Sequence, residues 1–262
     1  MNKTALLLVP GMLCSPRLYA EQVAALSGEA DIVVPDWRRA PLAIWDSWES
    51  AARWVVDQMP AGKFALAGLS LGGMLAVEIM QFAAERVTKL ALLDTGMRSQ
   101  NEAERAIRRA RIRLATEGHF ELVLGMQMSR FIPAYRLPDK KLVDAVMAMC
   151  GEIGVEIYKR QEELAAIRAD RRPDLPRLKC PTIVVCGRDD AATPLFLSEE
   201  MAAAIKGSEL IVVEQCGHLI TMEKPAETNA ILRKWLGSAP LRGAHSLSRQ
   251  RCATEWRAPS KD

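Results

Sequence analysis

Six short apolar runs alternate with helical segments along most of this 262-residue chain. The predicted strands cover residues 4–9, 31–34, 63–67, 89–93, 182–186 and 209–213, and the predicted helices cover 16–26, 47–59, 71–84, 194–205 and 225–236. Strands that are apolar almost throughout must be covered on both faces, and helices between successive strands supply the crossovers of a parallel sheet. The predicted fold class is therefore α/β, a mostly parallel sheet with helices on both faces.

The strand pattern is interrupted between residues 96 and 179, where only helical periodicity is found. Four helices are predicted there, over 101–116, 119–127, 139–149 and 152–166. An insertion at the carboxyl end of a strand lies over the edge where α/β sheets bind ligands. We therefore interpret 96–179 as a helical lid on a core made of 1–95 and 180–237. Residues 238–262 are polar, basic and without periodicity, which predicts a disordered tail.

Composition and charge limit the classes of function. Lys and Arg number 35 and Asp and Glu number 32, so the net charge of +3 is too balanced for a nucleic-acid-binding protein. No stretch approaches the length of a transmembrane helix, and the first apolar run ends at Pro10-Gly11 without a signal-peptide cleavage site. The six cysteines lack the paired spacing of zinc sites and fit a reducing compartment. We predict a cytoplasmic protein that binds neither nucleic acid nor membrane.

Residues 68–72 read Gly-Leu-Ser-Leu-Gly and lie between a predicted strand and a predicted helix. A serine on such a turn, with a glycine two residues before it and another two residues after it, is typical of a nucleophile elbow. The glycines are needed because the turn strains the backbone and brings strand and helix close together. The turn exposes the hydroxyl of Ser70 and places the amide of Leu71 at a helix N-terminus, where it can bind a developing oxyanion.

A serine nucleophile requires a base and a carboxylate that orients the base. Of the three histidines, His119 lies in the helical insertion and His245 in the tail, whereas His218 directly follows the last predicted strand. We therefore expect His218 to be the base. Asp189 and Asp190 follow another predicted strand, and either could orient the imidazole. The competing interpretation is that one of them caps the helix that follows.

The motifs GLSLGGM, GRDDAATP and CGHLITMEKP, in this order, resemble those of the α/β-hydrolase superfamily, in particular its small lidded esterases and lactonases. The resemblance covers about residues 4–236. In that family the acid usually stands three residues after the glycine of a G-x-x-D-x-x-x-P stretch, which favours Asp190 over Asp189. The resemblance also implies that the amide of Met12 is the second oxyanion donor, in a turn where Pro10 replaces the usual histidine.

The resemblance implies a serine hydrolase that cleaves a small carboxylic ester, thioester or lactone through an acyl-enzyme, with Ser70, His218 and Asp190 as its triad. This chemistry requires no metal and no organic cofactor. A carbon–carbon bond hydrolase or a perhydrolase with the same triad is the first alternative. A ligand-binding signalling protein of this fold is the second, because a fold does not by itself determine a function.

Three features bear on the substrate. The arginines of 105–113 could attract an acidic substrate or an acyl carrier, but a charge run is more often a solvated helix face, which we favour. Trp37 follows a predicted strand end and is a candidate substrate-binding residue. Four methionines between residues 126 and 149 fit a small-molecule substrate with a mainly apolar acyl group, and fit ordinary helix packing equally well.

Overall fold

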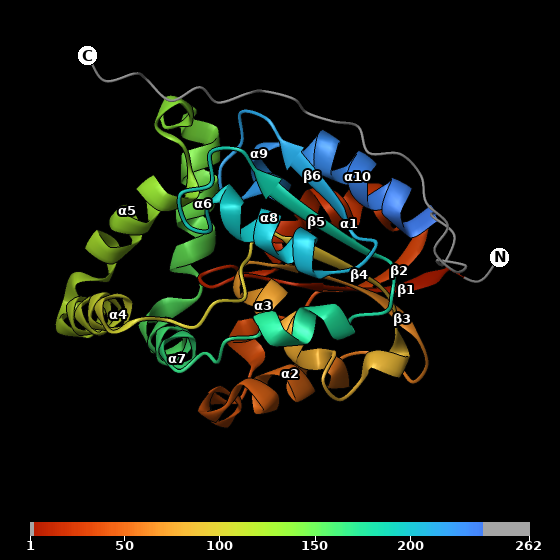
Figure 1. Ribbon diagram of the computed structural model, residues 1–262. Helices are drawn as coiled ribbons and strands as arrows, with labels where there is room; N and C mark the ends of the chain where they lie inside the picture. The colour runs from red at the N-terminus through yellow and green to blue at the C-terminus, as the bar shows by residue number, and fades with distance from the viewer. Residues whose placement is uncertain (1–2, 238–262) are drawn as a thin grey trace, which may run out of the picture.

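A six-stranded parallel sheet forms the centre of the protein (Figure 1). The computed structural model describes residues 3–237. The strands are β1 (Thr4–Val9), β2 (Ala30–Val33), β3 (Phe64–Leu69), β4 (Val87–Leu93), β5 (Thr182–Gly187) and β6 (Glu209–Val213). They lie in the order β2-β1-β3-β4-β5-β6, and every neighbouring pair is parallel. The predicted α/β fold class is confirmed.

Helices cover both faces of this sheet. The helices of the core are α1 (Ala20–Leu26), α2 (Trp48–Asp57), α3 (Leu71–Ile79), α8 (Leu195–Ala204), α9 (Ile220–Glu223) and α10 (Pro225–Gly237). Helices α1 and α10 pack together on one face, and α2 and α3 pack together on the other (Figure 1). The successive residues Leu6, Leu7 and Leu8 of β1 are all fully buried. This burial explains why the strands are apolar at consecutive positions instead of at alternate ones.

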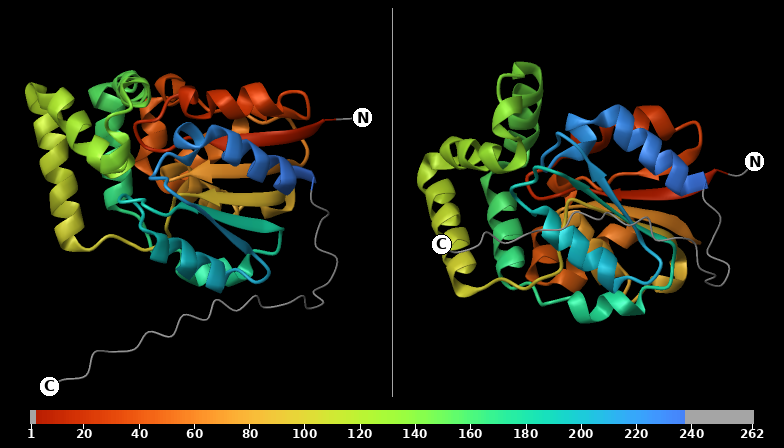
Figure 2. Two further views of the ribbon diagram at one scale, coloured as in Figure 1. Left: turned by 90° about the horizontal axis from the view of Figure 1, so that it is seen from above. Right: turned by 45° about the horizontal axis from the view of Figure 1, so that its top comes forward.

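Between β4 and β5 the described chain forms helices and turns. Its longer helices are α4 (Glu102–Leu114), α5 (Phe120–Phe131), α6 (Lys140–Gly151) and α7 (Gly154–Ala166). Gly118, with a φ of +93°, separates α4 from α5. Figure 2 shows this group beside the sheet, at the end to which the strand arrows point. The four helices therefore lie near the carboxyl ends of the strands, where parallel sheets hold their ligands.

The observed element boundaries agree with the predicted ones to within a few residues, with two exceptions. The helix predicted over 16–26 begins as a tight helical turn, Pro16–Tyr19, before α1 starts. The helix predicted over 71–84 ends at Ile79, after which the chain turns toward β4. The predicted disordered tail, 238–262, lies outside the described residues.

The described part of the chain contains no helix long and apolar enough to cross a membrane. Its cysteines are free thiols, and all except Cys180 are buried. Burial raises the pKa of Cys150 to about 12, so this thiol stays protonated at neutral pH. A buried, protonated cysteine packs as a small apolar residue.

Candidate active site

Ser70 lies at the tip of the turn from β3 into α3. Its φ of +56° and ψ of −117° are uncommon for a residue with a side chain, and such strain clusters at functional sites. A Cβ atom on Gly68 would lie 2.2 Å from the carbonyl oxygen of Gly72, and one on Gly72 would lie 2.0 Å from the carbonyl oxygen of Val9. The Ser70 amide donates to the Leu93 carbonyl at 2.9 Å, which ties the turn to the sheet. Both glycines are thus required by close backbone approach.

His218 lies in the loop after β6, and its Nδ1 is 2.8 Å from Oδ2 of Asp190. Both residues are almost fully buried. Asp190 also accepts hydrogen bonds from the amides of Ala192 (2.7 Å) and Thr193 (2.9 Å) and from the Thr193 hydroxyl (2.6 Å). Burial acts to raise the pKa of Asp190, but the charge of His218 and the hydrogen bonds outweigh it and hold that pKa below its usual range. The carboxylate is therefore ionised and can stabilise an imidazolium.

The structure distinguishes the two neighbouring aspartates. Asp189 is exposed and accepts a hydrogen bond from the Tyr135 hydroxyl at 2.6 Å. Asp190, in contrast, points inward to His218. Neither aspartate is the N-cap of α8, a position that Pro194 occupies. The geometry therefore agrees with Asp190 as the carboxylate that orients the imidazole.

The loop that carries His218 is held from two sides. Glu223 is 4% exposed and accepts hydrogen bonds from the amides of Gly217 (3.1 Å) and Leu219 (3.2 Å). The amide of His218 itself donates to the carbonyl of Phe131, the last residue of α5, at 3.0 Å. The Phe131 ring stacks on the imidazole, with centroids 5.4 Å apart and planes inclined by 17°. The inserted helices thus contact the imidazole directly.

The amide of Met12, in the loop after β1, and the amide of Leu71, at the start of α3, both lie near Ser70. A Cβ on Gly11 would lie 3.2 Å from the Cβ of Ser70, so the loop after β1 touches the turn after β3. Leu71 is the first residue of α3, and the first amides of a helix have no acceptor within the helix. Across residues 3–237, neither amide is hydrogen-bonded to another part of the chain. Two free donors near a serine hydroxyl can bind an oxyanion.

The loop after β1 is held without the family's usual histidine. Trp37 is fully buried, and its Nε1 donates to the carbonyl of Gly11 at 3.3 Å. Leu13, with a φ of +60°, donates its amide to Oε1 of Gln161 on α7 at 3.0 Å. The expectation that Trp37 binds substrate is therefore corrected. Its ring lies behind the loop and outside the cavity lining, and its indole supports the backbone next to Met12.

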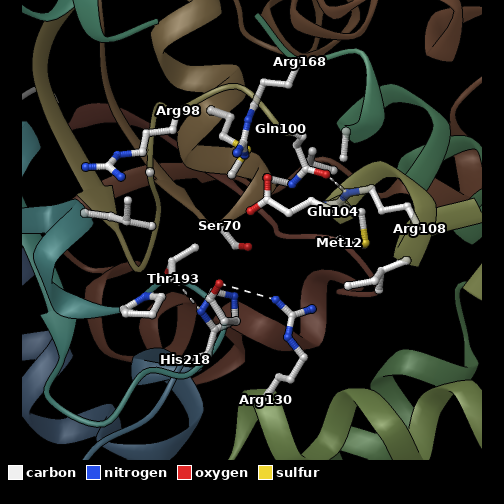
Figure 3. A pocket seen from close by; sticks show the side chains of 18 of the residues that line it. Met12, Ser70, Arg98, Gln100, Glu104, Arg108, Arg130, Arg168, Thr193 and His218 are labelled. Atoms are coloured by element: carbon white, nitrogen blue, oxygen red, sulfur yellow. Dashed lines mark hydrogen bonds between the residues drawn. The ribbon is translucent and has the colours of Figure 1, made fainter. Parts of the chain in front are cut away.

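A cavity of about 740 Å³ connects these groups. Ser70, His218, Met12 and Leu71 all line it. Figure 3 shows the Ser70 hydroxyl facing into the cavity, with His218 on one side. In the described structure the hydroxyl makes no direct hydrogen bond to the imidazole, and such contacts often tighten only in the substrate complex. The hydroxyl and the imidazole nevertheless line the same cavity, where a bound substrate can contact both.

The cavity wall is more polar than the sequence suggested. Its lining includes six arginines: Arg98, Arg108, Arg111, Arg130, Arg168 and Arg172. The lid methionines at 126, 128, 147 and 149 are absent from the lining, which favours ordinary helix packing over an apolar acyl surface. The interpretation of 105–113 as a solvated face holds only in part. Arg108 and Arg111 lie three residues apart on one side of α4, where both face the cavity.

Within residues 3–237, one group of side chains has the composition of a metal site. Atoms of Asp94, Cys186 and Asp190 lie within 4.8 Å of one another. Burial, the Asp94 charge and the Asp190 charge all raise the pKa of the Cys186 thiol, which keeps it protonated and a poor ligand. Asp94 accepts a hydrogen bond from the Gly187 amide at 2.8 Å, and Asp190 is engaged by His218. These contacts join β4, β5 and the histidine loop, and they favour a structural role.

Sequence reasoning missed four residues that shape this site. Glu223 stands five residues after His218 in the CGHLITMEKP motif. This spacing could have identified it as a residue that holds the histidine loop by accepting its backbone amides. Gln161 lies 148 residues from its partner Leu13, so no local signal links the two. Arg130 and Arg168 lie on different parts of the insertion, and only the fold brings them to one cavity.

Comparisons with known proteins agree with this geometry. The profile of the alpha/beta hydrolase family matches residues 6–231. The chain is 28% identical over 180 residues to the Klebsiella pneumoniae protein named "Putative carbamate hydrolase RutD", covering 67% of this chain and 66% of that protein. It is 25% identical over 243 residues to the Shigella flexneri protein of the same name, covering 88% and 90%.

Solved structures match the same region. A thermophilic esterase from Thermogutta terrifontis has a TM-score of 0.80 and 25% identity, covering 90% of both chains. The enol-lactonase from Burkholderia xenovorans LB400 also has a TM-score of 0.80, with 22% identity and coverage of 91% and 93%. The latter likeness shows the fold alone. The family profile spans most of the chain and includes every element that carries a site residue. The chain therefore belongs to the alpha/beta hydrolase family and is an enzyme of the hydrolase type.

Proposed function

We propose that this protein is a serine hydrolase of small carboxylic esters, thioesters or lactones, with Ser70 as nucleophile, His218 as base and Asp190 as the orienting acid. One observation carries the proposal. A serine on a strained turn, a buried aspartate–histidine pair and two free amides all meet at one cavity. A purely ligand-binding protein would have no need of the strained turn or of an ionised carboxylate behind a buried imidazole.

The proposed reaction is acyl transfer in two halves. Nε2 of His218 takes the proton of Ser70 as the hydroxyl oxygen attacks the substrate carbonyl, and Asp190 holds Nδ1–H and stabilises the imidazolium. The amides of Met12 and Leu71 bind the oxyanion, and the loss of one such donor costs about 3–4 kcal/mol. His218 then protonates the leaving group. Water, deprotonated by His218, hydrolyses the acyl-enzyme and restores the serine.

The relatives suggest which bonds to test. The names of the curated relatives point to a carbamate as substrate, and the Thermogutta terrifontis structure is of an esterase. Both reactions begin with attack on a carbonyl and need an oxyanion site, so both are compatible with this cavity. A panel should therefore contain short esters, thioesters, lactones and carbamates. Carbon–carbon bond cleavage and perhydrolysis remain the alternatives that such a panel would expose.

Labelling with a fluorophosphonate tests the proposal directly. We expect the wild-type protein to be labelled at Ser70, as located by peptide mass spectrometry, and the Ser70→Ala variant to remain unlabelled. His218→Ala should abolish hydrolysis of p-nitrophenyl acetate. His119→Ala is the matched control, because His119 lies in the turn between α4 and α5, outside the cavity lining, and should leave the rate unchanged. A folded wild-type protein that neither reacts with the probe nor hydrolyses any ester would refute the proposal.

A further inference from the structure

Four of the six cavity arginines have carboxylate partners. Arg98 pairs with Glu200, Arg108 and Arg111 with Glu162, and Arg172 with Asp170 and Glu200. Three carboxylates, Glu162, Asp170 and Glu200, offset most of the positive charge of these four arginines. Arg130 and Arg168 are different, because neither has a carboxylate within 4.0 Å in the part of the chain that the structure describes.

Arg168 is the less satisfied of the two. Its Nη1 contacts only the thioether sulfur of Met74, a weak acceptor, and its Nε is buried without any partner among residues 3–237. Arg130 donates to Oε1 of Gln127 at 3.2 Å and to the Ala192 carbonyl at 3.4 Å, so two neutral oxygens partly satisfy it. A partly buried guanidinium that lacks a carboxylate partner and an oxygen acceptor destabilises the fold, unless a ligand supplies the acceptor.

Burial acts on both groups in the same direction. It lowers the pKa of Arg130, and it lowers that of Arg168 to about 10. Both side chains still carry a full positive charge at neutral pH. In Figure 3, Arg168 extends into the cavity on one side of Ser70 and Arg130 extends from the other side. Among the described residues that line the cavity, Glu104 is the only acidic one. One of its oxygens accepts from the Asn101 amide at 2.8 Å, and its charge acts on Arg168 from beyond ion-pair distance.

We propose that the substrate carries a carboxylate that Arg168 binds, with Arg130 adding attraction from the opposite side of Ser70. The planar guanidinium offers parallel N–H donors that match a carboxylate in a bidentate geometry. Such a contact gives an acceptor to Nη2 of Arg168, for which residues 3–237 supply none. The substrate class becomes a monoester, monothioester or lactone of a dicarboxylic acid. This inference deepens the proposed function and rests on it.

A pair of esters of equal length tests the inference. Mono-p-nitrophenyl adipate ends in a carboxylate where p-nitrophenyl hexanoate ends in a methyl group. We expect wild-type kcat/KM to favour the adipate ester. Arg168→Gln should reduce the ratio of the two kcat/KM values by about tenfold or more. A change of this size corresponds to the free energy of one charge-assisted hydrogen bond. Arg168→Lys should retain part of the ratio, because lysine keeps the positive charge but lacks the parallel N–H donors of the guanidinium.

Two further variants complete the design. Arg130→Gln should reduce the ratio by less than Arg168→Gln, because no direct contact is lost. Arg109→Gln is the matched control. Arg109 carries the same charge on α4 but is exposed and absent from the cavity lining, so the ratio should stay at the wild-type value. A wild-type ratio near one, or a ratio unaffected by Arg168→Gln, would overturn the inference.

Binding without catalysis separates this inference from the proposed function. Calorimetry with adipate and the Ser70→Ala variant should show binding that the Ser70→Ala, Arg168→Gln double variant lacks. If adipate binds but no ester is hydrolysed and no probe reacts, the proposed function fails and the anion site stands. If the probe labels Ser70 and hexanoate is cleaved but adipate neither binds nor is favoured as an ester, the anion site fails and the hydrolase stands.

Discussion

Replacing Asp190 by Asn tests the most specific geometry in the site. Oδ1 of Asp190 accepts two backbone amides, which can only donate, so the carbonyl oxygen of an asparagine must keep that position. The amide nitrogen of the asparagine would then face Nδ1 of His218, 2.8 Å away from the present Oδ2. Because that nitrogen is also a donor, His218 must place its proton on Nε2. The imidazole then has no lone pair directed at Ser70.

The expected cost is about 10⁴-fold in kcat, the effect of the same substitution in the triad of a serine protease. At 1.36 kcal/mol for each tenfold change, this equals about 5 kcal/mol of lost transition-state stabilisation. The fold should tolerate the change, because both backbone amides keep their acceptor and the Thr193 hydroxyl can turn to accept from the new amide. A small shift in Tm together with a very large loss of rate is therefore the expected signature.

The assay is p-nitrophenyl acetate hydrolysis at neutral pH, with thermal unfolding measured on the same samples. Asp189→Asn is the matched control. It changes the neighbouring exposed carboxylate, which bonds Tyr135 and not the imidazole, so its rate should stay close to that of the wild type. The reasoning is refuted if Asp190→Asn retains more than about a tenth of the wild-type rate, or if Asp189→Asn is the more damaging change.

Three other predictions follow from the same contacts. Gly72→Ala would place a Cβ 2.0 Å from the Val9 carbonyl oxygen, so the free energy of unfolding in urea should fall by more than about 2 kcal/mol. An unchanged denaturation midpoint would contradict the close approach. Gln161→Leu leaves the Leu13 amide without its acceptor, which should lower the free energy of unfolding by about 1–3 kcal/mol. It should also lower kcat more than it raises KM, because the adjacent loop with the Met12 amide shifts. Equal kcat in the two proteins would argue against that coupling. Burial and a nearby charge raise the pKa of Asp94, so its ionisation opposes folding and the penalty grows as pH rises above the unfolded value of about 3.9. The Tm of Asp94→Asn should therefore increase relative to that of the wild type as pH rises above about 4, and a Tm difference independent of pH would speak against this.

The site shows clearly which inferences a sequence can support. Ser70 and Leu71 could be predicted because the elbow is a local motif whose glycines are demanded by backbone geometry. His218 followed from its place after the last strand, and the structure puts it 2.8 Å from Asp190. Gln161 had no comparable signal, because its partner lies 148 residues away and only the packing of α7 against the loop after β1 joins them.

The residues around the cavity were harder to predict from the sequence than the candidate catalytic residues. Trp37 looked like a pocket residue because it follows a strand, but its indole is turned behind the loop to hold Gly11. Arg108 looked solvated within a charge run, yet the docking of α4 turns its side chain into the cavity. Strand-end position predicts that a residue lies near the ligand edge. It does not predict which way the side chain points, because that depends on neighbours supplied by other segments.

The sequence by itself determined the alternation of apolar strands and helices, and with it the parallel sheet, the elbow and the order of the chemical groups along the chain. These depend on local backbone preferences and on periodic burial, both of which are written in consecutive residues. Only the tertiary structure decided which arginines stay unpaired. Pairing is a property of groups that meet in space: Glu162 pairs with both Arg108 and Arg111, whereas Arg168 has no carboxylate partner in the described chain.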